Sequence, residues 1–188
     1  MKKAKFTWTA AGVVLASSLF AIPGAYAGDT VCEGVLGPVT IDGSVIVPDN
    51  KSCTLRGTIV KGNVLVYTGA TLSANRVAVD GNIQAEGART VNVNPGSSVG
   101  GSVQIKQGGS ARVEQVRIKG DLQLFQNRSA LRAISNEIDG SMQAESNTGG
   151  LTISYNSIDS ALQCKQNFPA PKGTGNTASI KQDQCARL

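Results

Sequence analysis

Residues 118–124 read Ile-Lys-Gly-Asp-Leu-Gln-Leu, and residues 138–144 read Ile-Asp-Gly-Ser-Met-Gln-Ala, 20 positions later. Both follow one pattern: aliphatic, any residue, glycine, small polar, aliphatic, any residue, then a further small or aliphatic residue. Copies recur along the chain, and their glycine position is occupied by Gly43, Gly62, Gly81, Gly101, Gly120, Gly140 and Ser160. A fixed period of about 20 residues is typical of a solenoid, in which one supersecondary unit stacks on copies of itself.

The aliphatic positions within each copy alternate with polar ones, which predicts a strand with one buried face. A second strand follows in each period, and its expected inward residues are Leu55, Leu72, Val91, Val113, Leu131 and Leu151. No helical period appears after residue 27. We therefore predict an all-β, single-domain parallel β-helix over residues 28–166, built from about seven coils of 19–20 residues.

Asparagines also recur with the period. Asn75, Asn94, Asn136 and Asn156 are expected at the same turn of successive coils, with Gln115 in the fourth position of the series. Asparagine tolerates a left-handed backbone, and its amide can bond to an identical amide one coil away. The series is predicted to be structural.

The segment 1–27 has the features of a secretory signal peptide. A basic start with Lys2 and Lys3 precedes an apolar stretch over residues 10–22, and Ala25-Tyr26-Ala27 is a small-x-small cleavage site. The apolar stretch is short for a membrane span. We expect a secreted protein, extracellular or periplasmic, with no integral membrane span after cleavage; an uncleaved anchor is the alternative.

Most of the net positive charge lies in that leader. It holds three of the 18 basic residues and none of the 13 acidic ones, so the remainder carries 15 against 13, a net charge of +2. Charge alone therefore does not imply a strong nucleic-acid partner.

The four cysteines form two pairs with the same spacing. Cys32 and Cys53 are 21 residues apart, as are Cys164 and Cys185. Residues one period apart lie about 4.8 Å from each other in a stack of coils, close to the Cα separation of a disulfide. We predict the bridges Cys32–Cys53 and Cys164–Cys185, one at each end. The segment 167–188 is predicted to be a C-terminal cap that opposes polymerisation, so a monomer is expected.

The aliphatic-x-Gly-polar-aliphatic repeats and the asparagines resemble those of the pectin-lyase-like group of bacterial right-handed β-helix proteins. Their glycine-valine rhythm is also similar to that of bactofilin cytoskeletal proteins. The resemblance covers about residues 39–164 and implies a right-handed β-helix. It also implies that an enzyme of this group would use carboxylates for Ca²⁺ and an Arg or Lys base, in a cleft walled by long loops. The coils of this chain leave no insertion for such a wall.

No catalytic constellation is visible. The chain has no histidine, and no Gly-x-Ser-x-Gly elbow, P-loop or EF-hand loop is present. Asp139 and Asp159, on adjacent coils, could share a Ca²⁺ ion, or they are solvated acids near Lys119. We predict no catalytic residue, no metal site and no cofactor.

Two surfaces are candidates for binding. The first is a file of outward glutamines on one flat face: Gln84, Gln104, Gln123, Gln143 and Gln163. Beside it run Tyr67, Glu86, Lys106, Phe125, Glu145 and Lys165. A structural role is the alternative, with amides bonded between coils and opposite charges paired along the rod.

The second candidate surface is a basic cluster formed by Arg112, Arg117, Lys119, Arg128 and Arg132. It could hold an acidic polysaccharide or extracellular DNA through salt-sensitive contacts, or it could be an ordinary solvated surface.

These features favour a non-enzymatic structural or binding protein of the bacterial envelope or extracellular matrix, with polysaccharide or extracellular DNA as the expected partner. One alternative is a pectin-lyase-like carbohydrate-active enzyme. Another is a periplasmic scaffold for an envelope protein, held by the apolar start of the glutamine face at Ile46, Leu65 and Tyr67.

Overall fold

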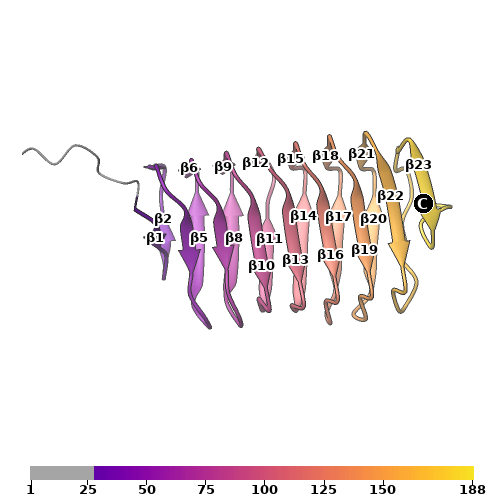
Figure 1. Ribbon diagram of the computed structural model, residues 1–188, viewed down its shortest axis with the longest axis horizontal. Coiled ribbons are helices and arrows are strands. Elements are labelled where there is room, and N and C mark those ends of the chain that lie inside the picture. Colours follow the sequence, from indigo (N-terminus) through magenta and orange to yellow (C-terminus); the bar gives the residue numbers. More distant parts are fainter. Residues whose placement is uncertain (1–27) are drawn as a thin grey trace, which may run out of the picture.

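A computed structural model describes residues 28–188; the expected signal peptide, residues 1–27, lies outside the described residues. The described part of the chain forms a parallel β-solenoid of about eight turns without a helix (Figure 1). The predicted all-β parallel β-helix is thereby confirmed. Three sheets, A, B and C, run along the rod, and each of the first seven turns contributes one strand to each of them; β22 and β23 extend sheet A alone.

Sheet A has nine strands. In spatial order they are β1 (Thr30–Val31), β4 (Val45–Val47), β7 (Val64–Val66), β10 (Ile83–Glu86), β13 (Val103–Lys106), β16 (Leu122–Phe125), β19 (Met142–Glu145), β22 (Ala161–Lys165) and β23 (Ile180–Asp183). All neighbours are parallel and in register, so equivalent residues of successive turns form columns.

Sheets B and C have seven strands each. Sheet B contains β2 (Val35–Leu36), β5 (Ser52–Arg56), β8 (Thr71–Asn75), β11 (Thr90–Val93), β14 (Ser110–Glu114), β17 (Leu131–Ile134) and β20 (Leu151–Ser154). Sheet C contains β3 (Thr40–Ile41), β6 (Ile59–Val60), β9 (Ala78–Val79), β12 (Ser98–Val99), β15 (Arg117–Ile118), β18 (Glu137–Ile138) and β21 (Ser157–Ile158).

The core is a column of aliphatic side chains enclosed by the three sheets. In one turn, Leu124 of sheet A, Leu131 of sheet B and Ile138 of sheet C are each no more than 1% exposed. The predicted inward residues of the second strand are likewise buried. No single turn encloses this column alone, so each turn depends on its neighbours for burial.

The segment predicted to be a cap continues the stack. Strand β23 pairs in parallel with β22, and Lys172 and Thr177 form bridges to Thr152 and Ser157 of the preceding turn. With this turn the solenoid has about eight turns instead of the predicted seven. This last turn escaped the sequence pattern because Lys181 and Asp183 occupy positions that are aliphatic in earlier turns.

Both predicted disulfides are present. The Cα atoms of Cys32 and Cys53 are 5.5 Å apart, and those of Cys164 and Cys185 are 5.2 Å apart. The bridges tie the first and last turns of the rod, and they are consistent with a protein of an oxidising compartment. Within residues 28–188, no helix has the length and apolar character to cross a membrane.

The predicted asparagine series was wrong in its alignment. Asn94 donates to Asn75 across one turn, but the next residue in that column is Glu114, not Gln115. Asn136 and Asn156 belong to a different column, which continues to Asn176. A further ladder, formed by Asn127, Asn147 and Asn167, lies where sheet A gives way to sheet B.

Candidate ligand-binding surface

The predicted glutamines form one straight column on the outer face of sheet A. Pairing places Gln84 beside Gln104, and the same register continues through Gln123, Gln143 and Gln163. Gln182 of β23 extends the column by one turn, a residue that the sequence pattern missed because its turn lacks the aliphatic repeat. We call these six residues the amide row.

A second column runs beside the amide row. It contains Tyr67, Glu86, Lys106, Phe125, Glu145 and Lys165, as predicted, because these residues are two positions further along the same strands. Tyr67 is 45% exposed, and the Lys106 ammonium lies 5.6 Å from the centre of the Phe125 ring. The column thus offers two aromatic rings among charges of both signs.

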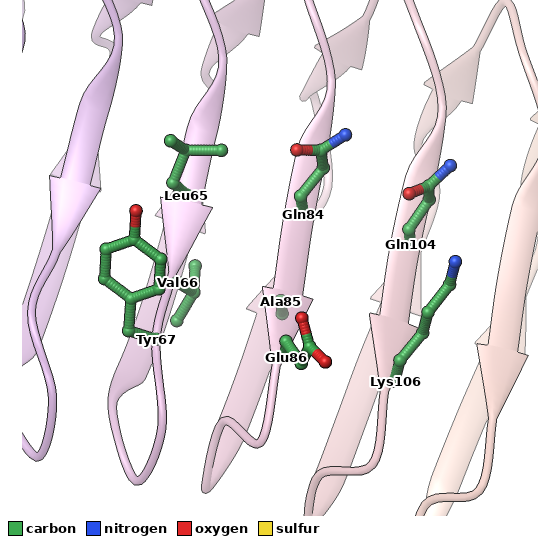
Figure 2. Close-up of a pocket in the computed structure, with 8 residues that line it drawn as sticks. All are labelled: Leu65, Val66, Tyr67, Gln84, Ala85, Glu86, Gln104 and Lys106. Atoms are coloured by element: carbon green, nitrogen blue, oxygen red, sulfur yellow. The ribbon is translucent and has the colours of Figure 1, made fainter.

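A shallow hollow opens between the two columns at their N-terminal end. Figure 2 shows Leu65, Gln84 and Gln104 in one row and Tyr67, Glu86 and Lys106 in the other, with the small side chain of Ala85 at the floor. The hollow has a volume of about 330 Å³. Two further hollows border Phe125, so the depression follows the direction of the rod.

The amides of the row are mostly not bonded to one another. Within the described chain, the only hydrogen bond between members of the row is the one that Gln163 Nε2 donates to Gln182 Oε1, at 3.0 Å. The predicted ladder of amides therefore exists only at the C-terminal end. The remaining amides of the row have donors and acceptors available to water or to a ligand.

The predicted pairing of charges along the second column is not found. In residues 28–188, the ion pairs within 4.0 Å involve none of Glu86, Lys106, Glu145 and Lys165. Two acids and two lysines leave this face without net charge. Its chemistry is that of a neutral polar surface with one exposed ring, Tyr67, and one half-buried ring, Phe125.

The predicted basic cluster is divided among several parts of the solenoid. Arg112 and Arg132 are neighbours on sheet B, where both contact Glu114, at 3.6 and 3.0 Å. Arg117 lies on sheet C and pairs with Glu137.

The two other members of the cluster lie at corners. Lys119 directly follows β15 of sheet C, and Arg128 lies between β16 and β17. The five residues are close in number, but they are spread over different sides of the rod because each sheet takes only a few residues of a turn.

The acidic positions also lie away from the amide row. Asp139 and Asp159 occupy adjacent turns after sheet C, and Asp80 pairs with Lys61 at 3.1 Å. Among the residues that the structure describes, no three potential ligand side chains gather as a metal site would require.

Two arginines that sequence analysis did not single out lie together. Arg56 and Arg76 line one hollow at the corner between sheets B and C. They belong to successive turns. Their proximity could be predicted only by knowing that both lie at the same corner of the solenoid.

No protein-family model, no curated protein and no solved structure matches this chain.

Proposed function

We propose that this protein is a non-enzymatic, monomeric binding protein of the bacterial envelope or extracellular matrix. Its ligand is an extended, uncharged polysaccharide that lies along sheet A, parallel to the axis of the rod. The amide row and the second column form the contact surface.

The observation that carries the proposal is the contrast between two kinds of stacked amide. The corner asparagines are buried and bonded to one another, for example Asn136 to Asn156 at 2.9 Å. Gln84, Gln104 and Gln123 are stacked with the same regularity, but they stay at the surface and do not bond to one another. The hydrogen bonds of the buried asparagines stabilise the fold, which explains why asparagine recurs at the corners. The outward glutamines make no such bonds, so we propose that they recur because they bind a ligand.

The spacing of the row suits a polymer of identical units. Neighbouring glutamines are about 4.8 Å apart, so the five from Gln84 to Gln163 extend over about 19 Å. This step is close to the length of one sugar unit in an extended glycan, so each amide can reach a polar group of a successive unit. Tyr67 and Phe125 supply apolar contacts for sugar rings.

The proposed location rests on the sequence and is consistent with the disulfides. Residues 1–27 have the composition of a secretory signal, and Cys32–Cys53 and Cys164–Cys185 suit an oxidising compartment. Export would place the protein where polysaccharides of the envelope or matrix are abundant.

The test is co-sedimentation of the purified secreted protein with insoluble cellulose and chitin, comparing wild type with the double variant Gln104→Ala/Gln123→Ala. Loss of two neutral hydrogen bonds should weaken binding about tenfold. The matched control is Asn92→Ala, an outward amide on sheet B whose side chain makes no hydrogen bond within residues 28–188, and it should bind as wild type.

Equal binding by the wild type and the double variant would refute the role of the amide row. The supernatant is also assayed for soluble sugar, because release of sugar would contradict a non-enzymatic function and favour the carbohydrate-active alternative. Absence of any binding would contradict the proposal, and capture of an envelope protein at Ile46, Leu65 and Tyr67 would then be tested.

A further inference from the structure

The corner between sheets B and C contains an open hollow that two arginines line. Its volume is about 640 Å³, and Arg56, Asn75, Arg76 and Asn94 line it. Arg56 lies opposite Asn75 in the register of β5 and β8, and Asn94 follows in the same column one turn later. Arg76 is the next residue along the chain after Asn75, so both guanidinium groups reach one corner from adjacent turns.

Neither arginine has an acidic partner. Within the described residues, the ion pairs involve other cations, and no hydrogen bond is donated by the side chain of Arg56 or Arg76. The nearest acid in the column of Arg56 is Glu114, and it is already held by Arg112 and Arg132. Two full positive charges therefore remain uncompensated at this corner.

Hydrogen bonds within the chain hold the polar side chains that line the hollow. Asn94 Nδ2 donates to Asn75 Oδ1 at 2.8 Å, and Asn75 Nδ2 donates to Ser73 Oγ at 3.3 Å. This ladder ends at Asn94, whose own Oδ1 accepts no hydrogen bond from the described chain. The Asn94 side chain thus keeps an open acceptor oxygen in the wall of the hollow that the two arginines also line.

The backbone leaves room beside the arginines. Gly57 and Gly96 have positive φ angles of 63° and 80°, a conformation that disfavours side chains. A Cβ atom on Gly96 would lie 3.3 Å from Arg76 Cγ, so the glycine allows the arginine to lie along the corner. Pro38 and Pro95 complete an apolar rim.

We infer that this corner is a second binding site, which takes the acid group of a sugar unit in an acidic polysaccharide. The planar guanidinium fork matches a carboxylate or sulfate in bidentate geometry. The Asn94 oxygen would accept from a sugar hydroxyl, and the proline rim would contact the ring. The inference does not depend on the proposed function, because it concerns another sheet and a charged ligand.

A nucleic acid is a poorer match for the same residues. DNA affinity depends on neutralising many phosphates along an extended path. Here the two free arginines occupy adjacent turns, and the next cations on sheet B are engaged by Glu114. The hollow suits one or two acid groups.

The site is tested by titrating the full secreted protein with soluble polygalacturonate, heparin, neutral dextran and a short DNA duplex, by calorimetry at low and high salt. The double variant Arg56→Gln/Arg76→Gln should weaken binding of an acidic polysaccharide about tenfold, since charge-assisted contacts at an exposed site are worth less than buried ones. Added salt should weaken wild-type binding.

The matched control is Lys172→Gln/Arg187→Gln, which removes the same charge from exposed cations elsewhere and should bind as wild type. Binding of polygalacturonate identifies a carboxylate as the acid group, and binding of heparin alone identifies a sulfate. Equal weakening by the two double variants would overturn the inference, because net charge would then explain the effect. Binding of DNA alone, or of no acidic polysaccharide, would also overturn it.

Discussion

At the scale of single residues, the buried asparagines determine how the corners close. Asn147 Nδ2 donates to Leu124 O and to Asn167 Oδ1, both at 2.8 Å. Its Oδ1 accepts from the backbone and side chain of Asn127, both at 3.0 Å. No shorter or longer polar side chain can make both sets of contacts, and the described core contains no buried polar side-chain atom without a partner.

Replacing this residue should be costly. Asn147→Ala would leave Asn127 N–H without its partner and remove the side-chain donor to Leu124 O in the interior, and we expect the free energy of unfolding to fall by about 3 kcal/mol. Urea unfolding followed by circular dichroism measures the change. Asn92→Ala, on the outer face, should change stability by no more than about 0.5 kcal/mol; a similar loss in both variants would refute the role of the ladder.

At the scale of the repeated element, the column of repeat glycines, from Gly43 to Gly140, determines how closely the backbones of successive turns approach. A Cβ atom on Gly81 would lie 2.6 Å from Gly62 O and 3.0 Å from Gly62 C, so the backbones meet where a side chain would stand. Serine occupies this column only in the last two turns, as Ser160 and Ser179. Gly81 is hydrogen-bonded through its backbone to Gly62 in the turn before and to Gly101 in the turn after. Its backbone therefore has less freedom to move than that of the last turns.

The expected result of Gly81→Ala is therefore a loss of about 2 kcal/mol through overpacking of the backbone. Gly34→Ala is the matched control, since a Cβ atom there would have no neighbour within 4 Å. Thermal unfolding of the two variants compares them directly. If both melt at the temperature of the wild type, close backbone approach is not what requires glycine in this column.

At the scale of the whole molecule, the two ends of the rod differ from the middle. A central turn has a neighbour on both sides, but among the described residues the first turn has a neighbouring turn on one side only. Cys32–Cys53 ties that turn to the next one, and Cys164–Cys185 does the same at the other end. In a solenoid, contacts are between adjacent turns, so an untied end opens without unfolding the rest.

Removal of the first bridge should therefore act locally. In Cys32→Ser/Cys53→Ser, we expect faster hydrogen exchange over residues 30–41 and unchanged exchange over residues 118–145. The constraint is worth about 3 kcal/mol for a loop of this length. Hydrogen-exchange mass spectrometry measures each region. A uniform increase along the rod would contradict the picture of independent ends.

Sequence alone determined the architecture because the information is local and repeated. Alternation of aliphatic and polar residues defines each strand, and a period of about 20 residues defines the stack. The disulfide pairs followed from the same period. The column of glutamines was also predictable, because the five predicted members keep the same distance from the repeat glycine.

Only the tertiary structure decided which residues share a column at the corners. The length of the repeat is not constant along the chain, and a shift of one position moves a side chain to the other face of its strand. Uneven repeat length separated Asn136 from Asn94. The basic cluster was divided because its members belong to different sheets and corners, and Arg56 meets Arg76 because both line one corner. The hydrogen bonds of the amides could not be predicted either. The sequence pattern predicts stacked amides both at the corners and on the face of sheet A. Only burial and geometry distinguish the asparagines, which bond to one another, from the glutamines, which mostly do not.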